Sequence, residues 1–342
     1  MTSRPAPRRA PPTVIAHRGA SAYRPEHTLA SYRLAIEMGA DYIEPDLVST
    51  KDHQLVVRHE NEISGTTDVA DHPEFATRMT RKVIDGREVT GWFTEDFTLA
   101  ELRTLRAKER LPDVRPQNTA MNGRFQIPTF QEVIDLARRH GVGIYPETKH
   151  PTYFRSIGLP LEEPLVATLE RNGLNRRDAK VFVQSFEVGN LLRLNRMTRV
   201  PLVQLIDASG APADLAAKGD PRTYDDLVTP AGLREIARYA DGIGPEKGRI
   251  IPRVMPANTL GAPTTLVRDA HRAGLLVHPF TFRPENTFLP AELQEGDPAQ
   301  PAFASARGDE PAEIRRFLEQ GIDGLFADNP VTAVVVRARM AR

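Results

Sequence analysis

Two carboxylates stand two residues apart at the end of a strand-like run, in the sequence Asp-Tyr-Ile-Glu-Pro-Asp-Leu of residues 41–47. Side chains two residues apart in a strand point to the same side, so Glu44 and Asp46 share one face. Pro45 cannot donate to a strand ladder, which indicates that the strand ends there. Carboxylates this close raise each other's pKa unless a cation lies between them. The pair indicates a cation site or, alternatively, an exposed acidic strand end.

A second strand-like run, residues 142–145, is also followed by a proline and a carboxylate. Glu147 completes a three-carboxylate site with Glu44 and Asp46 if the two strand ends meet. Lys149 would then lie on the same side, where it suits an anionic ligand. The alternative for Glu147 and Lys149 is an ordinary surface ion pair. An all-oxygen site in a chain without cysteine favours a hard cation, Ca²⁺ or Mg²⁺, with positions left open for water and substrate.

Two histidines, His17 and His59, each follow a short run of β-branched and aliphatic residues. Cleavage of a phosphodiester needs a base to activate the nucleophile and an acid to protonate the leaving alkoxide. Imidazole serves either role near neutral pH. Arg18 offers a planar fork that matches a phosphate, although it could instead form a salt bridge with a carboxylate such as Glu26. A lone histidine at a strand end is more often structural, so the prediction depends on both lying near the carboxylates.

The elements that must position these residues alternate along the chain between β-branched runs and segments of helical period. About eight strand-helix units favour an α/β fold, a TIM (β/α)8 barrel, over a sandwich or a helical bundle. A doubly wound open sheet is the main alternative, but no glycine-rich dinucleotide fingerprint follows any strand. Strands are expected at 13–16, 41–48, 142–145, 180–186, 201–206, 241–244, 275–282 and 324–327. Helices are expected at 27–38, 130–139, 161–171, 188–196, 232–239, 265–273 and 311–320.

Three stretches interrupt this alternation, at about 61–124, 208–230 and 283–310. The first is long and polar, with a short helix expected at 99–107, and the others are rich in Pro, Ala, Asp and Gly. Loops of this length inside a compact domain are usually functional or mobile, and on a barrel we expect them at the C-terminal face, around the active site. The chain is therefore predicted to consist of a disordered segment, 1–12, and a single barrel domain, 13–342.

The composition excludes several partners. The 342 residues include 45 basic and 45 acidic side chains, so no net field favours nucleic acid or an anionic membrane. No apolar run is long enough to span a bilayer, and we expect no stable membrane insertion. The absence of cysteine excludes disulfides and thiolate chemistry. The first twelve residues lack the apolar centre of a signal peptide, which leaves a cytoplasmic location open. The oligomeric state is not indicated.

Taken in order, the motifs resemble those of the glycerophosphodiester phosphodiesterase family, over about residues 14–330. The resemblance includes features of the bacterial periplasmic branch, which would place the protein outside the cytoplasm. The motifs are His17-Arg18-Gly19, Pro25-Glu26-His27-Thr28, Glu44-Pro45-Asp46, His59 and Glu147-Thr148-Lys149.

The resemblance implies a TIM barrel with the site at the C-terminal ends of the strands, and it assigns a role to each candidate residue. His17 and His59 would be the acid-base pair, and Arg18 and Lys149 would hold the phosphate. One divalent cation is implied, Ca²⁺ in the first place and Mg²⁺ as the alternative. Its ligands would be Glu44, Asp46 and Glu147.

The substrates that the resemblance implies are small deacylated phospholipids such as glycerophosphocholine and glycerophosphoethanolamine, cleaved to sn-glycerol 3-phosphate and an alcohol. The chain departs from the usual family pattern at His27, where many members have asparagine, and at Glu60, where many have aspartate. The alternatives are a phospholipase of type C or D, a non-catalytic binding protein and a sugar isomerase on the same fold. The sequence does not identify the headgroup alcohol.

Overall fold

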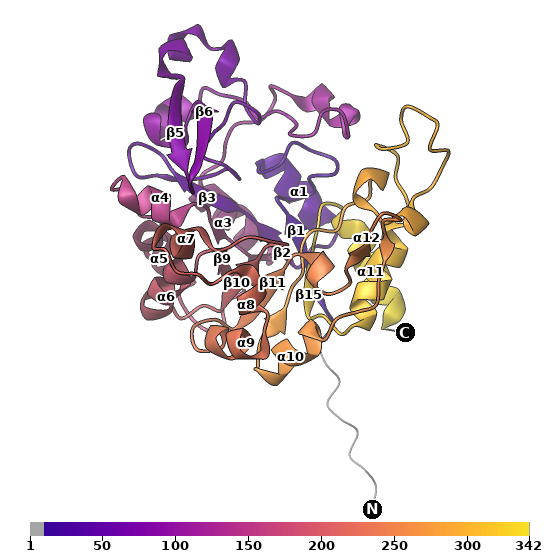
Figure 1. The fold of residues 1–342 in the computed structure, drawn as a ribbon. Coiled ribbons are helices and arrows are strands. Elements are labelled where there is room, and N and C mark those ends of the chain that lie inside the picture. The colour runs from indigo at the N-terminus through magenta and orange to yellow at the C-terminus, as the bar shows by residue number, and fades with distance from the viewer. Residues whose placement is uncertain (1–9, 342) are drawn as a thin grey trace, which may run out of the picture.

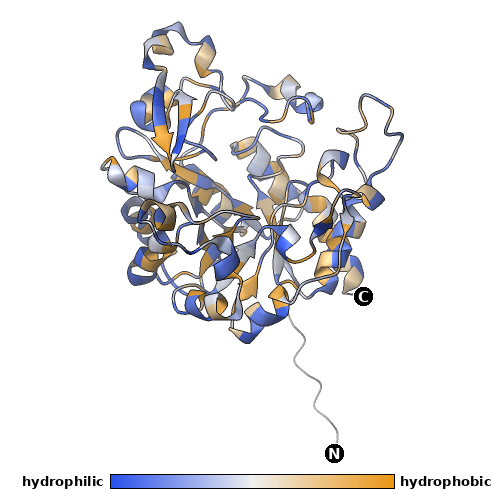
Figure 2. Ribbon diagram, viewed as in Figure 1, coloured by the Kyte–Doolittle hydropathy of each residue, from blue (hydrophilic) through white to orange (hydrophobic). Residues whose placement is uncertain are grey.

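The computed structural model describes residues 10–341, so most of the segment 1–12, predicted to be disordered, lies outside the described residues. Within this range a core of parallel strands is surrounded by helices, as a TIM barrel requires (Figure 1). Along the surrounding helices hydrophobic and hydrophilic residues alternate (Figure 2). None of the described helices is both long and apolar enough to cross a bilayer.

The described residues supply eight parallel strand positions, two of which are interrupted by a proline. The strands are β1 (Thr13–His17), β2 (Tyr42–Glu44) continued by β3 (Asp46–Ser49), β7 (Gly143–Ile144) continued by β8 (Glu147–Thr148), β9 (Val183–Ser185), β10 (Leu202–Ile206), β11 (Gly242–Pro245), β14 (Leu276–Val277) and β15 (Gly324–Ala327). They pair in the orders β15-β1-β2-β7 and β14-β11-β10-β9-β8-β3. Parallel bridges join the two groups at Ile144–Val181 and at Phe282–Ala327, which closes the barrel.

The strand expected at 41–48 is confirmed, but the expectation that it ends at Pro45 was wrong, because the chain continues directly as β3. A proline lacks only the amide hydrogen, and the carbonyl of Pro45 still accepts a hydrogen bond from the amide of Glu147 at 3.0 Å. Pro146 does the same for the amide of Gln184 at 2.9 Å. Both prolines therefore interrupt the ladder without ending the strand, and the candidate carboxylates lie beside the interruptions.

The helices follow the predicted positions, with local differences at their ends. They are α1 (Leu29–Glu37), α3 (Phe130–His140), α5 (Glu162–Arg171), α6 (Val188–Met197), α9 (Pro230–Ile236), α10 (Leu266–Arg272) and α11 (Glu310–Glu319). The first helix begins two residues later than predicted, because the Thr28 side chain caps it by accepting from the Ser31 amide, and His27 has a φ of 55°. The final helix, α12 (Pro330–Met340), was not predicted.

The interior of the barrel is packed with side chains, so it is not a channel. Ile15, Tyr145, Val203 and Phe326 form a buried cluster inside the ring of strands. A second and larger cluster fills the space between the strands and the helices. Because the barrel is filled, a ligand has access only at an end of it.

The three interrupting stretches are more ordered than the sequence suggested. The first contains an antiparallel hairpin that stands away from the barrel (Figure 1). The helix predicted at 99–107 covers only four residues, and Ala107 instead forms a bridge with Thr67. The second contains two short helices. These elements are β5 (Thr80–Ile84), β6 (Arg87–Gly91), α2 (Leu99–Leu102), α7 (Ala213–Ala217) and α8 (Tyr224–Leu227). The third is irregular apart from short 3₁₀ turns.

Candidate active site

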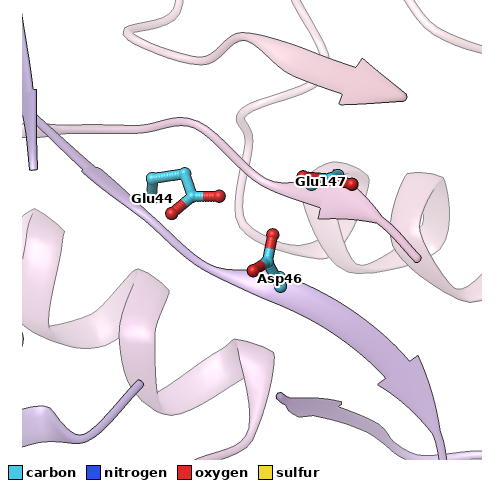
Figure 3. Close-up of side chains that lie close together, drawn as sticks. All are labelled: Glu44, Asp46 and Glu147. Atoms are coloured by element: carbon cyan, nitrogen blue, oxygen red, sulfur yellow. The ribbon is translucent and has the colours of Figure 1, made fainter. Parts of the chain in front are cut away.

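Three buried carboxylates meet where β2, β3 and β8 adjoin. Figure 3 shows the side chains of Glu44, Asp46 and Glu147 gathered close together from these neighbouring strands. The parallel register places Asp46 beside Glu147. One oxygen from each residue lies within 4.8 Å of the others, and each residue is at most 6% exposed. The two sequence segments that were predicted to meet do meet.

This arrangement fits a divalent cation. Burial, and then the neighbouring Asp46, raise the pKa of Glu44 well above its usual range. Burial likewise raises the pKa of Glu147 to about 8. The Oδ1 atom of Asp46 is buried and has no hydrogen-bond partner, so an acceptor is left for a cation. All the donors are carboxylate oxygens, the set that Ca²⁺ and Mg²⁺ prefer.

Two cationic side chains flank the carboxylates. The guanidinium of Arg18 forms the alternative salt bridge that the sequence had left open, with Nη1 2.9 Å from Glu26 Oε2. Its backbone amide also donates to Glu44 Oε2 at 2.7 Å, and its Nε has no hydrogen-bond partner. The ammonium of Lys149 donates to Glu147 Oε1 at 2.8 Å. Each cation is thus tied to the cluster and retains donors for an anion.

Both candidate histidines line one cavity of about 130 Å³, together with Arg18, Glu44 and Glu147. Burial, and then the neighbouring Arg18, lower the pKa of His17 to about 4. Burial lowers the pKa of His59 well below its usual range, and the nearby cations act in the same direction. The neutral form of each imidazole is therefore favoured, and in that form its free ring nitrogen can accept a proton.

Partners hold the two imidazoles in place. His59 is a quarter exposed, its Nδ1 contacts Glu60, and its Nε2 lies 3.2 Å from Lys149 Nζ. Glu60 is in turn held by Arg110, which belongs to the first interrupting stretch. The Nδ1 atom of His17 lies 2.6 Å from Asp328 Oδ1. The seven predicted residues are thus brought together at one end of the barrel.

Several residues at the site were missed from the sequence. His27, noted only as a departure from the family pattern, is fully buried with Nε2 2.8 Å from Asp46 Oδ2, so it holds that carboxylate. Gln184 donates to Glu44 Oε1 at 3.3 Å. Asp328 could have been noticed, because it directly follows the strand β15, as Arg18 follows β1 and Lys149 follows β8. Gln184 gave no signal, since it lies within an expected strand.

Two larger cavities adjoin this site, and residues of the interrupting stretches line both. One, of about 410 Å³, includes Lys149, Phe186 and Tyr224. The other, of about 420 Å³, shares Phe280 and Arg283 with the histidine cavity. The site can therefore hold a ligand that extends beyond a phosphate on either side.

The sequence and the fold both have known counterparts. The profile of the glycerophosphoryl diester phosphodiesterase family matches residues 17–332. A glycerophosphodiester phosphodiesterase of Arabidopsis thaliana is 39% identical over 332 residues, which are 93% of this chain and 83% of the plant protein. That of Haemophilus influenzae is 30% identical over 349 residues, covering 94% of this chain and 88% of its own length. The same fold is found in a solved structure of an Oleispira antarctica phosphodiesterase in complex with the product sn-glycerol-3-phosphate. The TM-score is 0.59 and the sequence identity 20%, and the match covers 95% of this chain and 96% of the other.

Proposed function

Since the chain belongs to the glycerophosphoryl diester phosphodiesterase family, we propose that it hydrolyses glycerophosphodiesters to sn-glycerol 3-phosphate and an alcohol. Glycerophosphocholine and glycerophosphoethanolamine are the proposed substrates. The observation that carries the proposal is one cavity lined by two histidines beside a buried three-carboxylate cluster. The sn-glycerol-3-phosphate bound to the Oleispira antarctica phosphodiesterase supports the same phosphate product for this chain.

Glu44, Asp46 and Glu147 would hold one divalent cation, Ca²⁺ or alternatively Mg²⁺. When bound, the cation supplies electrostatic stabilisation of the negative charge that develops on the phosphate. Arg18 and Lys149 would add donors to the phosphate oxygens from two sides of the cluster. The buried surroundings make each of these interactions stronger than it would be in water.

The two histidines would divide the proton transfers between them. One, as a neutral imidazole, takes the proton of the attacking hydroxyl, and the other, as an imidazolium that has already taken up a proton, gives that proton to the departing alkoxide. If the attacking group is the glycerol hydroxyl next to the phosphate, a cyclic phosphate forms and water then opens it with the roles reversed. If water attacks directly, the same two transfers complete the reaction in one step. A rapid-quench time course that shows transient cyclic glycerophosphate would support the first route.

The proposal is tested by release of sn-glycerol 3-phosphate from glycerophosphocholine. We expect release that a chelator abolishes and that added Ca²⁺ or Mg²⁺ restores. The double variant His17→Ala/His59→Ala, checked for folding by circular dichroism, is the negative control. A folded wild-type protein that releases no product with either metal, from a panel of headgroups, would refute the proposal.

A further inference from the structure

We propose that Asp328 is a positioning residue for His17, and that Arg115 makes this positioning depend on the docking of the stretch 61–124. The inference rests on the proposed function in one respect, because that function requires His17 to transfer a proton. Asp328 and Arg115 lie outside the family motifs, and 311 positions separate Asp328 from His17.

The backbone around Asp328 is fixed on both sides. This residue directly follows β15; its amide donates to the carbonyl of Phe282 at 3.0 Å, and its carbonyl accepts from the amide of Ala22 at 3.1 Å. The side chain is almost fully buried. With the backbone anchored at two points, the carboxylate has little freedom to move away from His17.

Each oxygen of the Asp328 carboxylate has a defined partner. Oδ1 lies 2.6 Å from His17 Nδ1, and Oδ2 accepts from Arg115 Nη2 at 2.6 Å, with Arg283 Nε at 3.2 Å. Burial alone would raise the pKa of Asp328, but Arg115, His17 and Arg283 outweigh it and hold the pKa well below its usual range. The carboxylate is therefore ionised and acts only as an acceptor.

This charge state determines the tautomer of His17. An ionised carboxylate can only accept, so the hydrogen of the neutral imidazole must lie on Nδ1. The lone pair is then on Nε2, the ring nitrogen that the pair with Asp328 leaves free to face the cavity that His17 lines. Asp328 also offsets the positive charge that His17 gains when Nε2 takes up a proton. Both effects prepare His17 for proton transfer.

Arg115 connects this pair to the two longest interrupting stretches. It belongs to 61–124, and its Nε donates at 2.7 Å to Glu285, which belongs to 283–310. Its Nη1 donates to the carbonyl of Ser21 at 3.0 Å, in the turn after His17. The guanidinium of Arg115 thus joins three segments to the Asp328 carboxylate. This requires several N–H donors held in a fixed planar arrangement, which only an arginine side chain provides. If Arg115 were absent, Arg283 would still lie close to the Asp328 carboxylate.

The alternative is that Asp328 forms an ordinary buried ion pair with no effect on chemistry. The chain offers a matched control for this at the other end of the same strand. Asp323 immediately precedes β15 and lies 2.8 Å from His271 Nε2, and it accepts from the amide of Val277 at 2.9 Å. Asp323 and Asp328 are both aspartates paired with a histidine, but only Asp328 lies at the active-site end of the barrel.

The test compares Asp328→Asn, Arg115→Lys and the control Asp323→Asn on glycerophosphocholine with saturating Ca²⁺. For Asp328→Asn we expect kcat to fall by roughly 10²- to 10⁴-fold with little change in KM. For Arg115→Lys, which keeps the charge but loses the fork, we expect a fall of about tenfold or more in kcat. Asp323→Asn should keep kcat within about threefold of the wild type by the same reasoning.

A second readout does not depend on activity. In ¹⁵N NMR spectra of the wild type, we expect His17 to carry its hydrogen on Nδ1, and in Asp328→Asn we expect this preference to weaken or reverse. Folded Asp328→Asn with kcat and tautomer like those of Asp323→Asn would overturn the proposal. If Asp328→Asn does not fold, an unchanged kcat in Arg115→Lys would overturn the proposal. A wild type without activity would refute the proposed function instead, while the NMR result would still decide the positioning of His17.

Discussion

Replacing Glu44 by glutamine removes the negative charge that this side chain would carry when a cation is bound and keeps the shape of the side chain. Two full negative charges within 4.8 Å of each other repel by at least about 3 kcal/mol at an effective dielectric constant of about 20. Burial and this repulsion raise the pKa of Glu44, so the metal-free protein favours an uncharged side chain at this position. The Arg18 amide can still donate to a glutamine oxygen, and the buried, unpartnered Oε1 of Gln184 can accept from the new amide group. We therefore expect metal-free Glu44→Gln to be at least as stable as the metal-free wild type.

With metal present the order should reverse. A ligand at a hundred times its Kd stabilises a protein by about 2.7 kcal/mol, which for a chain of this size raises the Tm by roughly 4 °C. Loss of one ligand charge, worth about 3 kcal/mol, should weaken Ca²⁺ binding by about 100-fold. At the same Ca²⁺ concentration, most of the increase in Tm should therefore be absent from Glu44→Gln.

The assay is thermal unfolding in chelator and over a Ca²⁺ titration, with Glu310→Gln as the control. Glu310 is also a buried glutamate, and burial raises its pKa to about 8, but it lies outside the carboxylate cluster. Glu310→Gln should keep the full Ca²⁺-dependent increase in Tm. If metal-free Glu44→Gln unfolded well below the wild type and still showed the full increase, the assignment of Glu44 as a ligand would be wrong.

Three further predictions concern single side chains. His59→Ala should lower kcat by roughly 10²- to 10⁴-fold and leave the Tm nearly unchanged, because the side chain is a quarter exposed; steady-state kinetics and thermal unfolding check this. Lys149→Met should raise KM for glycerophosphocholine by about tenfold, as expected for a lost charge-assisted contact to phosphate, and initial rates over a range of substrate concentrations measure it. Burial lowers the pKa of His278 from 6.5 to about 4, so the unfolded chain binds this proton first as the pH falls through that window. Stability should therefore decrease by about 2 kcal/mol between pH 7 and pH 5 on account of His278, and urea unfolding of His278→Gln should lack this part of the decrease.

The sequence by itself determined the fold class and the carboxylate cluster. Parallel strands present their C-terminal ends at one face of a barrel, so residues that follow strands are brought together whatever their distance along the chain. Glu44, Asp46 and Glu147 stand beside prolines that interrupt two neighbouring strands, and one oxygen of each lies within 4.8 Å of the others. The helix at 130–139 was equally readable, because Thr129 with Glu132 begins it and Gly141 ends it.

The partners of these residues were decided only by the tertiary structure. Asp328 contacts His17 because β15 closes the barrel against β1, and no local pattern records which strands become neighbours. Arg115 reaches Asp328 from a long polar stretch whose path depends on its docking. His27 points at Asp46 only because its backbone takes a positive φ in the turn before α1. Local spacing fixes which residues face the site, whereas orientation and protonation depend on long-range contacts that form only when the barrel closes.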